Sequence, residues 1–272
     1  MPITRRTFTD YLFCPMMVYL RAKRLVKPNA NRSNALLIHS LRQRVFMELL
    51  DHEHRLVCSL PSNAPRKLIT GGYVSEFSEL LARLLSQNNA VLENAGVSNG
   101  DVYNSLFSEF VPEIDKRVSQ IHSFMAKSKA SGEELWRSLT PKVYHYFNAS
   151  LSDLGMELTV DKAEVYDDSV RTTVVKKPSA PNKGVWPSDL LELGACSLAA
   201  EARFQRPAKK GFVCYGTVLR EVSINQFIRE KTVKTCREIS ALIAGDIKPR
   251  RAQNRNKCLN CRLVEACRGV PV

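Results

Sequence analysis

Residues 156–177 read MELTVDKAEVYDDSVRTTVVKK, and this stretch decides the expected fold class. Residues 156–168 and 170–177 are rich in β-branched side chains, and turn-forming Asp and Ser separate the two runs. Branched side chains favour the half-buried surface of a sheet, whereas Asp and Ser favour tight turns. The stretch therefore predicts the two strands of a β-hairpin.

The segments after this hairpin alternate between helix and strand. Residues 188–204 have the apolar spacing of a helix with Ser188 or Asp189 as its N-cap, and residues 211–224 return to a strand pattern. Residues 225–244 predict an amphipathic helix that a glycine ends. The order strand, strand, helix, strand, helix predicts an α/β fold, with a mixed sheet flanked by helices.

The residues before the hairpin have mainly helical patterns. Residues 6–26 predict a helix that Pro15 breaks or kinks, and residues 33–52 predict a second helix, which carries His39. After an irregular segment over residues 51–68, the pattern is again helical from about 72 to 150. We identify no metal or phosphate motif in this middle block.

Three cysteines lie near one another in NKCLNCRLVEACRG, residues 256–269, with the spacing Cys-x2-Cys-x5-Cys: they are Cys258, Cys261 and Cys267. Three thiolates leave a tetrahedral site one ligand short. Cys14 is the expected fourth ligand, because Pro15 directly after it breaks the helix where a thiolate could face a cluster. Cys58, in the irregular segment, remains an alternative. The other three cysteines fall at positions expected to be buried, where the thiol packs as a small apolar group.

Ligation by cysteine alone fits either zinc or an iron–sulfur cluster, and the spacing does not choose between them. The chain has no apolar run near the ~20 residues that a membrane span needs. No leader with a charged start and an apolar centre opens the sequence, so a cytoplasmic location is expected. In that reducing compartment a Cys-x-x-Cys pair indicates metal binding more often than a disulfide.

The composition is strongly basic, with 40 Lys and Arg against 27 Asp and Glu and a formal net charge of +13. Such an excess favours an anionic partner, of which nucleic acid comes first and an anionic membrane surface second. Basic side chains gather around the cysteine tail, where they are expected to contact phosphates without reading sequence: Lys248, Arg250, Arg251, Arg255, Lys257 and Arg262.

One cysteine-proline in the first helix and the later Cys-x2-Cys-x5-Cys resemble the CRISPR-associated RecB-like exonucleases of the adaptation machinery, the family counted fourth among CRISPR-associated proteins. The resemblance covers residues 5–50 and 155–268 and includes APNKGVWPSDLLELGACSLAAEARF, residues 180–204. It implies a PD-(D/E)xK restriction-endonuclease-like core and a [4Fe–4S] cluster on Cys14 and the three terminal cysteines. The block from about 51 to 150 is longer than is usual in that family.

The resemblance also implies a divalent metal site for Mg²⁺ or Mn²⁺. His39 matches the family's helical histidine at the metal, and Asp161 matches the carboxylate of the first core strand. Glu164 is a second candidate for that carboxylate. Lys177 stands where the catalytic lysine of the acid-x-lysine motif belongs.

This sequence departs from the family pattern at three positions. Val175 stands in place of the metal-binding acid, and the family's Gln and Tyr on the next helix are replaced by Glu192 and Cys196. A valine removes a hard oxygen ligand that such a metal needs. Glu192 is the residue that could restore the lost carboxylate, so the expected catalytic set is Asp161, Lys177 and Glu192.

The resemblance divides the chain into four parts. Residues 1–50 would hold the N-terminal helices, 51–150 a helical insertion, 151–245 the nuclease core, and 246–272 the basic iron–sulfur segment. The implied function is binding of single-stranded overhangs or ends of prespacer DNA together with CRISPR integrase subunits, with reduced or lost exonuclease activity. The alternative is a zinc-ribbon nucleic-acid-binding protein without enzymatic ancestry.

Overall fold

The computed structural model describes residues 2–26, 34–176, 179–252 and 254–270. The chain forms two compact units, one of Met1–Asn29 with Phe147–Val272 and the other of Ala30–Tyr146. The first is called the sheet unit below and the second the helical unit, and each is described by itself. No helix among the described residues combines the length and the apolar character that crossing a bilayer requires.

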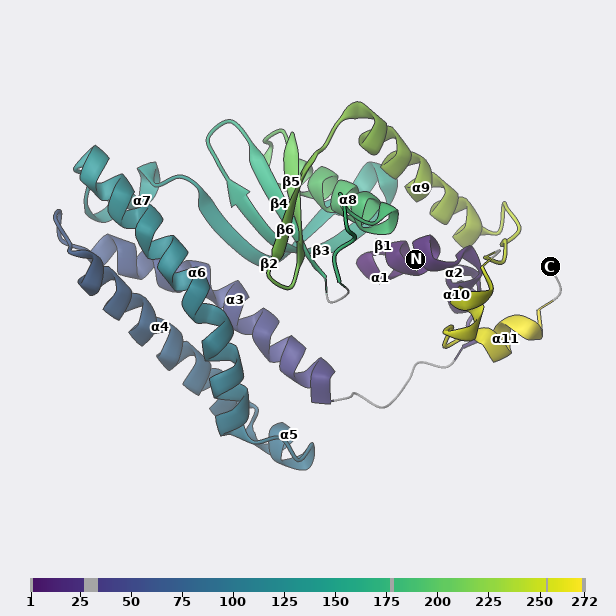
Figure 1. The fold of residues 1–272 in the computed structure, drawn as a ribbon, viewed down its shortest axis with the longest axis horizontal. Coiled ribbons are helices and arrows are strands. Elements are labelled where there is room, and N and C mark those ends of the chain that lie inside the picture. Colours follow the sequence, from purple (N-terminus) through teal and green to yellow (C-terminus); the bar gives the residue numbers. More distant parts are fainter. Residues whose placement is uncertain (1, 27–33, 177–178, 253, 271–272) are drawn as a thin grey trace. The chain divides into compact units, whose positions relative to one another are not determined.

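A mixed sheet organises the sheet unit (Figure 1). Its strand order is β1-β3-β4-β5-β6, and β2 also pairs with β3. The pairs β1/β3 and β4/β5 are parallel, whereas β3/β4 and β5/β6 are antiparallel. The predicted mixed sheet with flanking helices is therefore confirmed. The strands are β1 (Ile3–Thr4), β2 (Lys142–Leu151), β3 (Met156–Val165), β4 (Val170–Lys176), β5 (Lys210–Tyr215) and β6 (Val218–Ser223).

The predicted hairpin is formed by β3 and β4, in the register Lys162↔Thr173 and Val165↔Val170. The segment over residues 211–224, predicted as one strand, is instead a second hairpin of β5 and β6. Its turn contains Gly216 at φ +60°, a conformation that glycine adopts at no steric cost. The prediction missed this turn because one glycine in a β-branched run is a weak signal.

Helix α8 (Pro187–Phe204) lies against the sheet, and α9 (Gln226–Ala244) packs on α8. Because Gly194 of α8 has no side chain, α9 approaches so closely that a Cβ there would overlap the Thr232 hydroxyl. The N-cap of α8 is Trp186 rather than Ser188 or Asp189, since Pro187 takes the first helical position that suits its fixed φ. The predicted end of α9 at a glycine is confirmed by Gly245 at φ +96°.

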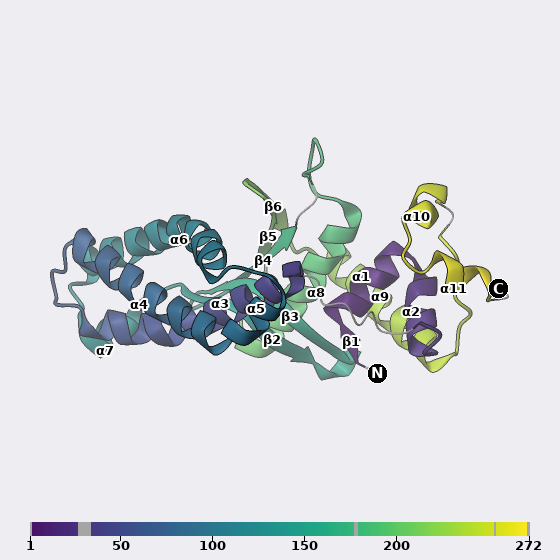
Figure 2. The same ribbon diagram turned by 90° about the horizontal axis from the view of Figure 1, so that it is seen from below.

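The first predicted helix is divided at Cys14 into α1 (Arg5–Phe13) and α2 (Pro15–Ala22). Cys14 has an extended backbone between them, as the prolyl break predicts. The cysteine tail contains two short helices, α10 (Arg255–Leu259) and α11 (Val264–Arg268). Helix α11 contacts α2, and Leu263, between the two short helices, packs in one apolar cluster with Leu20 of α2. Figures 1 and 2 both show the yellow tail beside the purple α2.

In the helical unit, α3, α4 and α6 are long and lie side by side (Figures 1 and 2). A buried ion pair between Arg117 and Glu53, with Nε and Oε1 at 2.6 Å, lies within its apolar core. The helical unit begins before residue 51, where the helical insertion was predicted to start. Helix α3 also continues to residue 59, so the part of the predicted irregular segment that precedes Pro61 is mostly helical. The helices are α3 (Asn34–Ser59), α4 (Arg66–Gln87), α5 (Asn89–Asn94), α6 (Asn99–Ser128) and α7 (Gly132–Ser138).

Candidate functional site

Two buried carboxylates meet one guanidinium beside the sheet. Asp161 of β3 is 6% exposed and Glu192 of α8 is 3% exposed. Arg5, the first residue of α1, donates from Nη2 to Asp161 Oδ2 and from Nε to Glu192 Oε1, both at 2.8 Å. Its Nη1 donates to the second oxygen of Asp161. A single arginine thus bridges two of the three residues predicted to hold a metal, Asp161 and Glu192.

Lys176, the last residue of β4, completes the site from the strand that pairs with β3. Its ammonium contacts Glu192 Oε2 and lies 3.4 Å from Asp189 Oδ1. Asp189 in turn accepts a hydrogen bond of 2.7 Å from the Tyr215 hydroxyl. Three carboxylates and two cations therefore form one network, with Tyr215 at its edge.

Burial and hydrogen bonding fix the protonation of this network. Burial alone would lower the pKa of Arg5, but its hydrogen bond to Asp161 and the surrounding negative charge outweigh that effect and raise the pKa. Burial, together with the bond to Asp189, raises the pKa of the Tyr215 hydroxyl to about 12. Burial also raises the pKa of the Cys196 thiol to about 12, one helical turn from Glu192. At neutral pH the arginine is charged, and the phenol and thiol are neutral.

A divalent ion does not fit this arrangement while Arg5 is in place. Each oxygen of Asp161 and Glu192 already accepts from Arg5 or Lys176, and Asp161 Oδ2 also accepts from the backbone N–H of Val175 at 2.7 Å. Mg²⁺ and Mn²⁺ bind through such carboxylate oxygens. The guanidinium supplies positive charge between the two carboxylates that were predicted to bind the ion.

Two other residues predicted for the site have contacts of their own. His39 is on α3 in the helical unit, where its ring meets that of Tyr146 edge-on at 6.3 Å. Glu164 accepts a hydrogen bond from the Tyr166 hydroxyl at 3.2 Å. Lys177 lies outside the described residues. Their metal-binding and catalytic roles remain predictions.

Sequence reasoning did not identify Arg5, Lys176, Asp189 or Tyr215 as members of the site. For Lys176 a signal existed, because the period of two along β4 puts it on the same face as the fully buried Val174. That face turns toward α8, so Val174, rather than Val175, holds the position two residues before the lysine of the network. For Arg5 the sequence offered no signal.

Cys14 and the three cysteines of the tail line one cavity between α2, α10 and α11. The backbone N–H of Ala252 donates to Cys14 Sγ at 3.3 Å, and that of Leu263 donates to Cys261 Sγ at 3.4 Å. Apolar side chains that include Met16 and Leu20 form much of the remaining wall. The structure thus brings the four predicted ligands together, and Cys58 belongs to the other unit.

The sulfur atoms in this cavity are spread apart. Across the described part of the chain, three potential ligand atoms of His, Cys, Asp or Glu fall within 4.8 Å of one another only at His54, Cys58 and Glu133. No three of the cavity's Sγ atoms therefore approach that closely. Backbone N–H groups donate to two of the four sulfurs, and hydrogen bonds of this kind also occur at sulfur atoms that bind metal.

Basic side chains around the cavity divide into two groups. Lys257 donates to the carbonyl of Phe13 at 3.0 Å, and Arg251 donates to the carbonyls of Cys267 and Val270 at 2.9 and 2.7 Å. These two therefore fasten the tail to itself and to the end of α1. Arg251 is nevertheless exposed, as are the other four residues predicted to contact phosphate: Lys248, Arg250, Arg255 and Arg262.

Comparisons with known proteins add little to this geometry. No family model matches the chain. No curated protein matches it. Among solved structures, the chain is similar to a crystal structure at 2.19 Å described as "Putative exonuclease" from Eubacterium rectale, with 12% sequence identity and a TM-score of 0.32 over 90% of this chain and 95% of that one.

Proposed function

We propose that the chain is a RecB-like nuclease-fold protein of CRISPR adaptation that binds DNA ends and has lost metal-dependent cleavage. The observation that carries the proposal is the bridge from Arg5 to both Asp161 and Glu192. The order of the sheet and α8, with a carboxylate on β3 and a lysine at the end of β4, supports a PD-(D/E)xK ancestry. The sequence resemblance supports the assignment to adaptation.

Loss of cleavage follows from charge and ligand supply. Phosphodiester hydrolysis in this fold class needs a divalent ion to activate water and to stabilise the negative charge of the transition state. Here the acid two residues before Lys176 is replaced by Val174, and a guanidinium occupies the two carboxylates that remain. Loss of the ion would cost more than ~3 kcal/mol of transition-state stabilisation, or about a hundredfold in rate.

The cysteine cavity is proposed to hold a [4Fe–4S] cluster on Cys14, Cys258, Cys261 and Cys267. The shared cavity supports a common metal centre on these four thiols, and the choice of an iron–sulfur cluster over zinc rests on the family resemblance. When bound, the cluster would join two distant segments covalently through iron, so that its binding free energy would add to the free energy of folding. The alternative is a zinc ribbon on the same four cysteines.

DNA is the proposed partner, because a net charge of +13 and the exposed basic residues near the cavity suit a phosphate backbone. Single-stranded overhangs or ends of prespacers, and the CRISPR integrase subunits, follow from the family resemblance. In this role the protein would protect or measure overhangs for the integrase. Contacts from these side chains to phosphate would give affinity for many DNA sequences.

Two measurements test the proposal. Anaerobically purified protein should contain iron and absorb near ~400 nm, and Cys14→Ser should abolish this band while Cys58→Ser leaves it unchanged. A colourless protein that contains zinc at these cysteines would favour the zinc ribbon.

Labelled duplex with a single-stranded overhang, incubated with Mn²⁺, should be bound but not shortened. If the overhang is trimmed and Asp161→Ala and Glu192→Ala abolish trimming, the protein is an active nuclease and the proposed loss of cleavage is wrong. Binding without trimming by wild type and both variants is the expected result.

A further inference from the structure

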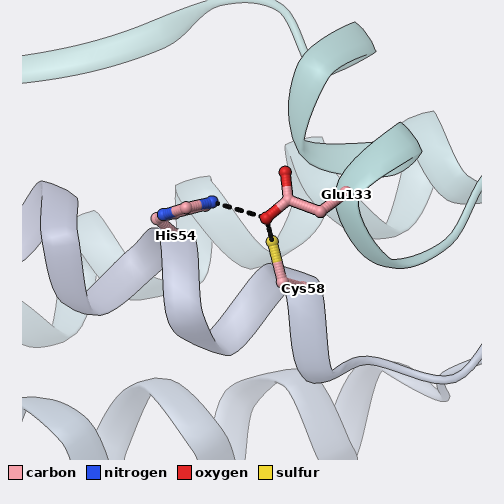
Figure 3. Close-up of side chains that lie close together, drawn as sticks. All are labelled: His54, Cys58 and Glu133. Atoms are coloured by element: carbon pink, nitrogen blue, oxygen red, sulfur yellow. Dashed lines mark hydrogen bonds and ion pairs between the residues drawn. The ribbon is translucent and has the colours of Figure 1, made fainter.

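Three side chains of different ligand type converge in the helical unit, far along the chain from the cysteine cavity. His54 and Cys58 lie four residues apart on α3, so both project from the same face of the helix. Glu133 projects toward them from the first turn of α7 (Figure 3). The group therefore combines an imidazole, a thiol and a carboxylate.

The spacing of the ligand atoms matches that around one small metal ion. Glu133 Oε1 lies 3.1 Å from His54 Nε2 and 3.3 Å from Cys58 Sγ, and all three atoms fall within 4.8 Å of one another. Tetrahedral zinc, with bonds of ~2.0–2.3 Å to N, O and S, holds its ligand atoms about 3.3 to 3.6 Å apart. Small rotations of the side chains would place an ion at the centre of the three.

The two helices that carry these groups are anchored within the unit. Leu135 of α7 is fully buried in the core that α3 helps to form. The Trp136 ring packs on the His54 ring, with centroids 4.9 Å apart. Gly132, at φ +57°, turns the chain into α7 directly before Glu133. The three groups are thus held near one another by packing as well as by their own hydrogen bonds.

A hydrogen bond joins two of the three groups directly. Cys58 Sγ donates its thiol proton to Glu133 Oε1 at 3.3 Å. Zinc would displace that proton and bind the resulting thiolate, as zinc sites with cysteine ligands do.

We propose that His54, Cys58 and Glu133 form a Zn²⁺ site with three protein ligands and an open fourth position for water. Mixed N, S and O donors suit Zn²⁺, whereas Mg²⁺ and Ca²⁺ prefer oxygen alone. The side chains of His54 and Glu133 are 43% and 58% exposed, which leaves a path for the ion and room for a bound water. The site is independent of the function proposed above.

The test uses Co²⁺ as a spectroscopic stand-in for Zn²⁺ in the full-length, iron-loaded protein, in which the terminal cysteines are occupied. Co²⁺ should add a thiolate-to-metal charge-transfer band that Zn²⁺ removes by competition. Cys58→Ser should abolish the band, and Cys14→Ser should keep it after allowance for any Co²⁺ in the emptied cysteine cavity. Zinc content after dialysis should be one ion lower in Cys58→Ser than in wild type.

Matched variants identify the other two ligands. His54→Ala and Glu133→Gln should each weaken Zn²⁺ binding by more than about 100-fold. Loss of a residue that only hydrogen-bonds to a ligand costs up to about 100-fold, and loss of a ligand itself should cost more. Two controls should leave the Zn²⁺ affinity within about threefold of wild type: His52→Ala on the same helix and Glu134→Gln in the same turn. Affinity should fall with decreasing pH, because protons compete for the thiolate and imidazole.

Equal Co²⁺ spectra and equal zinc contents in wild type and Cys58→Ser would overturn the proposal. So would Zn²⁺ affinities that are unchanged in both His54→Ala and Glu133→Gln. The triad would then be a hydrogen-bonded contact between α3 and α7. Circular dichroism of each variant establishes that a lost band does not reflect an unfolded unit.

Discussion

Replacing Arg5 by methionine tests whether a guanidinium has taken the place of a metal ion. Methionine keeps an unbranched apolar side chain but removes the charge and all three donors that contact Asp161 and Glu192. Breaking a buried ion pair by removing one partner commonly costs about 3–5 kcal/mol. In the variant, Asp161 still accepts a hydrogen bond from the N–H of Val175, and Glu192 still pairs with Lys176. We therefore expect a loss of stability at the lower end of this range, about 3 kcal/mol.

This loss should lower the Tm of the sheet unit by about 6–12 °C, at about 2–4 °C per kcal/mol for a unit of this size. Arg6→Met is the matched control: its side chain is 72% exposed and lies 4.0 Å from Asp10, a surface pair worth at most ~1 kcal/mol. Differential scanning calorimetry at neutral pH measures both variants.

The decisive step adds Mn²⁺. In Arg5→Met the freed carboxylate oxygens become available to a hard cation, so Mn²⁺ at a hundred times its Kd should restore about 2.7 kcal/mol. The wild-type Tm should not respond to Mn²⁺, apart from any effect that Arg6→Met shares. If Mn²⁺ stabilises wild type and no longer stabilises Arg5→Met, the arginine supports a metal site instead of replacing it, and the reasoning fails.

Three further predictions concern packing, pH and salt. Gly194→Ala should destabilise the protein by about 1–3 kcal/mol, since a Cβ would overlap Thr232. The control is Gly71→Ala, at an exposed helical position with open space, which should stabilise the protein by up to ~1 kcal/mol. Chemical denaturation measures both variants. Burial raises the pKa of Cys196 and Cys236 from 9.0 to about 12, so the folded state holds these thiol protons more tightly than the unfolded state does. Their contribution to stability should be complete below pH 9 and should fall between pH 9 and about pH 12. Thermal melts measure this profile, and a flat profile over that range would contradict the assigned burial. DNA affinity should drop by at least ~10³ between 50 and 200 mM salt if six or more phosphates are contacted, and a shallow dependence would argue against backbone binding.

Local signals predicted the elements that local chemistry controls. Pro15 after Cys14 predicted the break between α1 and α2, since proline cannot continue a hydrogen-bonded helix. β-branched runs predicted β3 and β4. Weaker local signals failed, as for β2, where aromatic residues in KVYHYFNASL favour a strand but follow a long helical pattern.

The candidate site could be predicted only in part, because its central contact is not local. Asp161 and Glu192 were predicted through the family pattern, whereas Arg5 lies 156 positions from Asp161 in the chain. No local propensity reports a partner at that separation. Lys176 was missed for a simpler reason: the motif was aligned by its letters to Lys177, whereas strand alternation places Lys176 toward α8.

The hydrogen bond from Lys257 to Phe13 joins the tail to the end of α1, next to Cys14. The long stretch of chain between Cys14 and the tail cysteines has a consequence for biogenesis. Cys14 is synthesised first, and the three cysteines of the tail follow about 240 residues later, which at 5–20 residues per second is roughly 10 to 50 s. During that interval the nascent α1–α2 segment lacks the three other thiols of the cavity. Assembly of the proposed cluster would therefore wait until the tail has been synthesised, and a premature stop before codon 258 would remove three of the four proposed ligands.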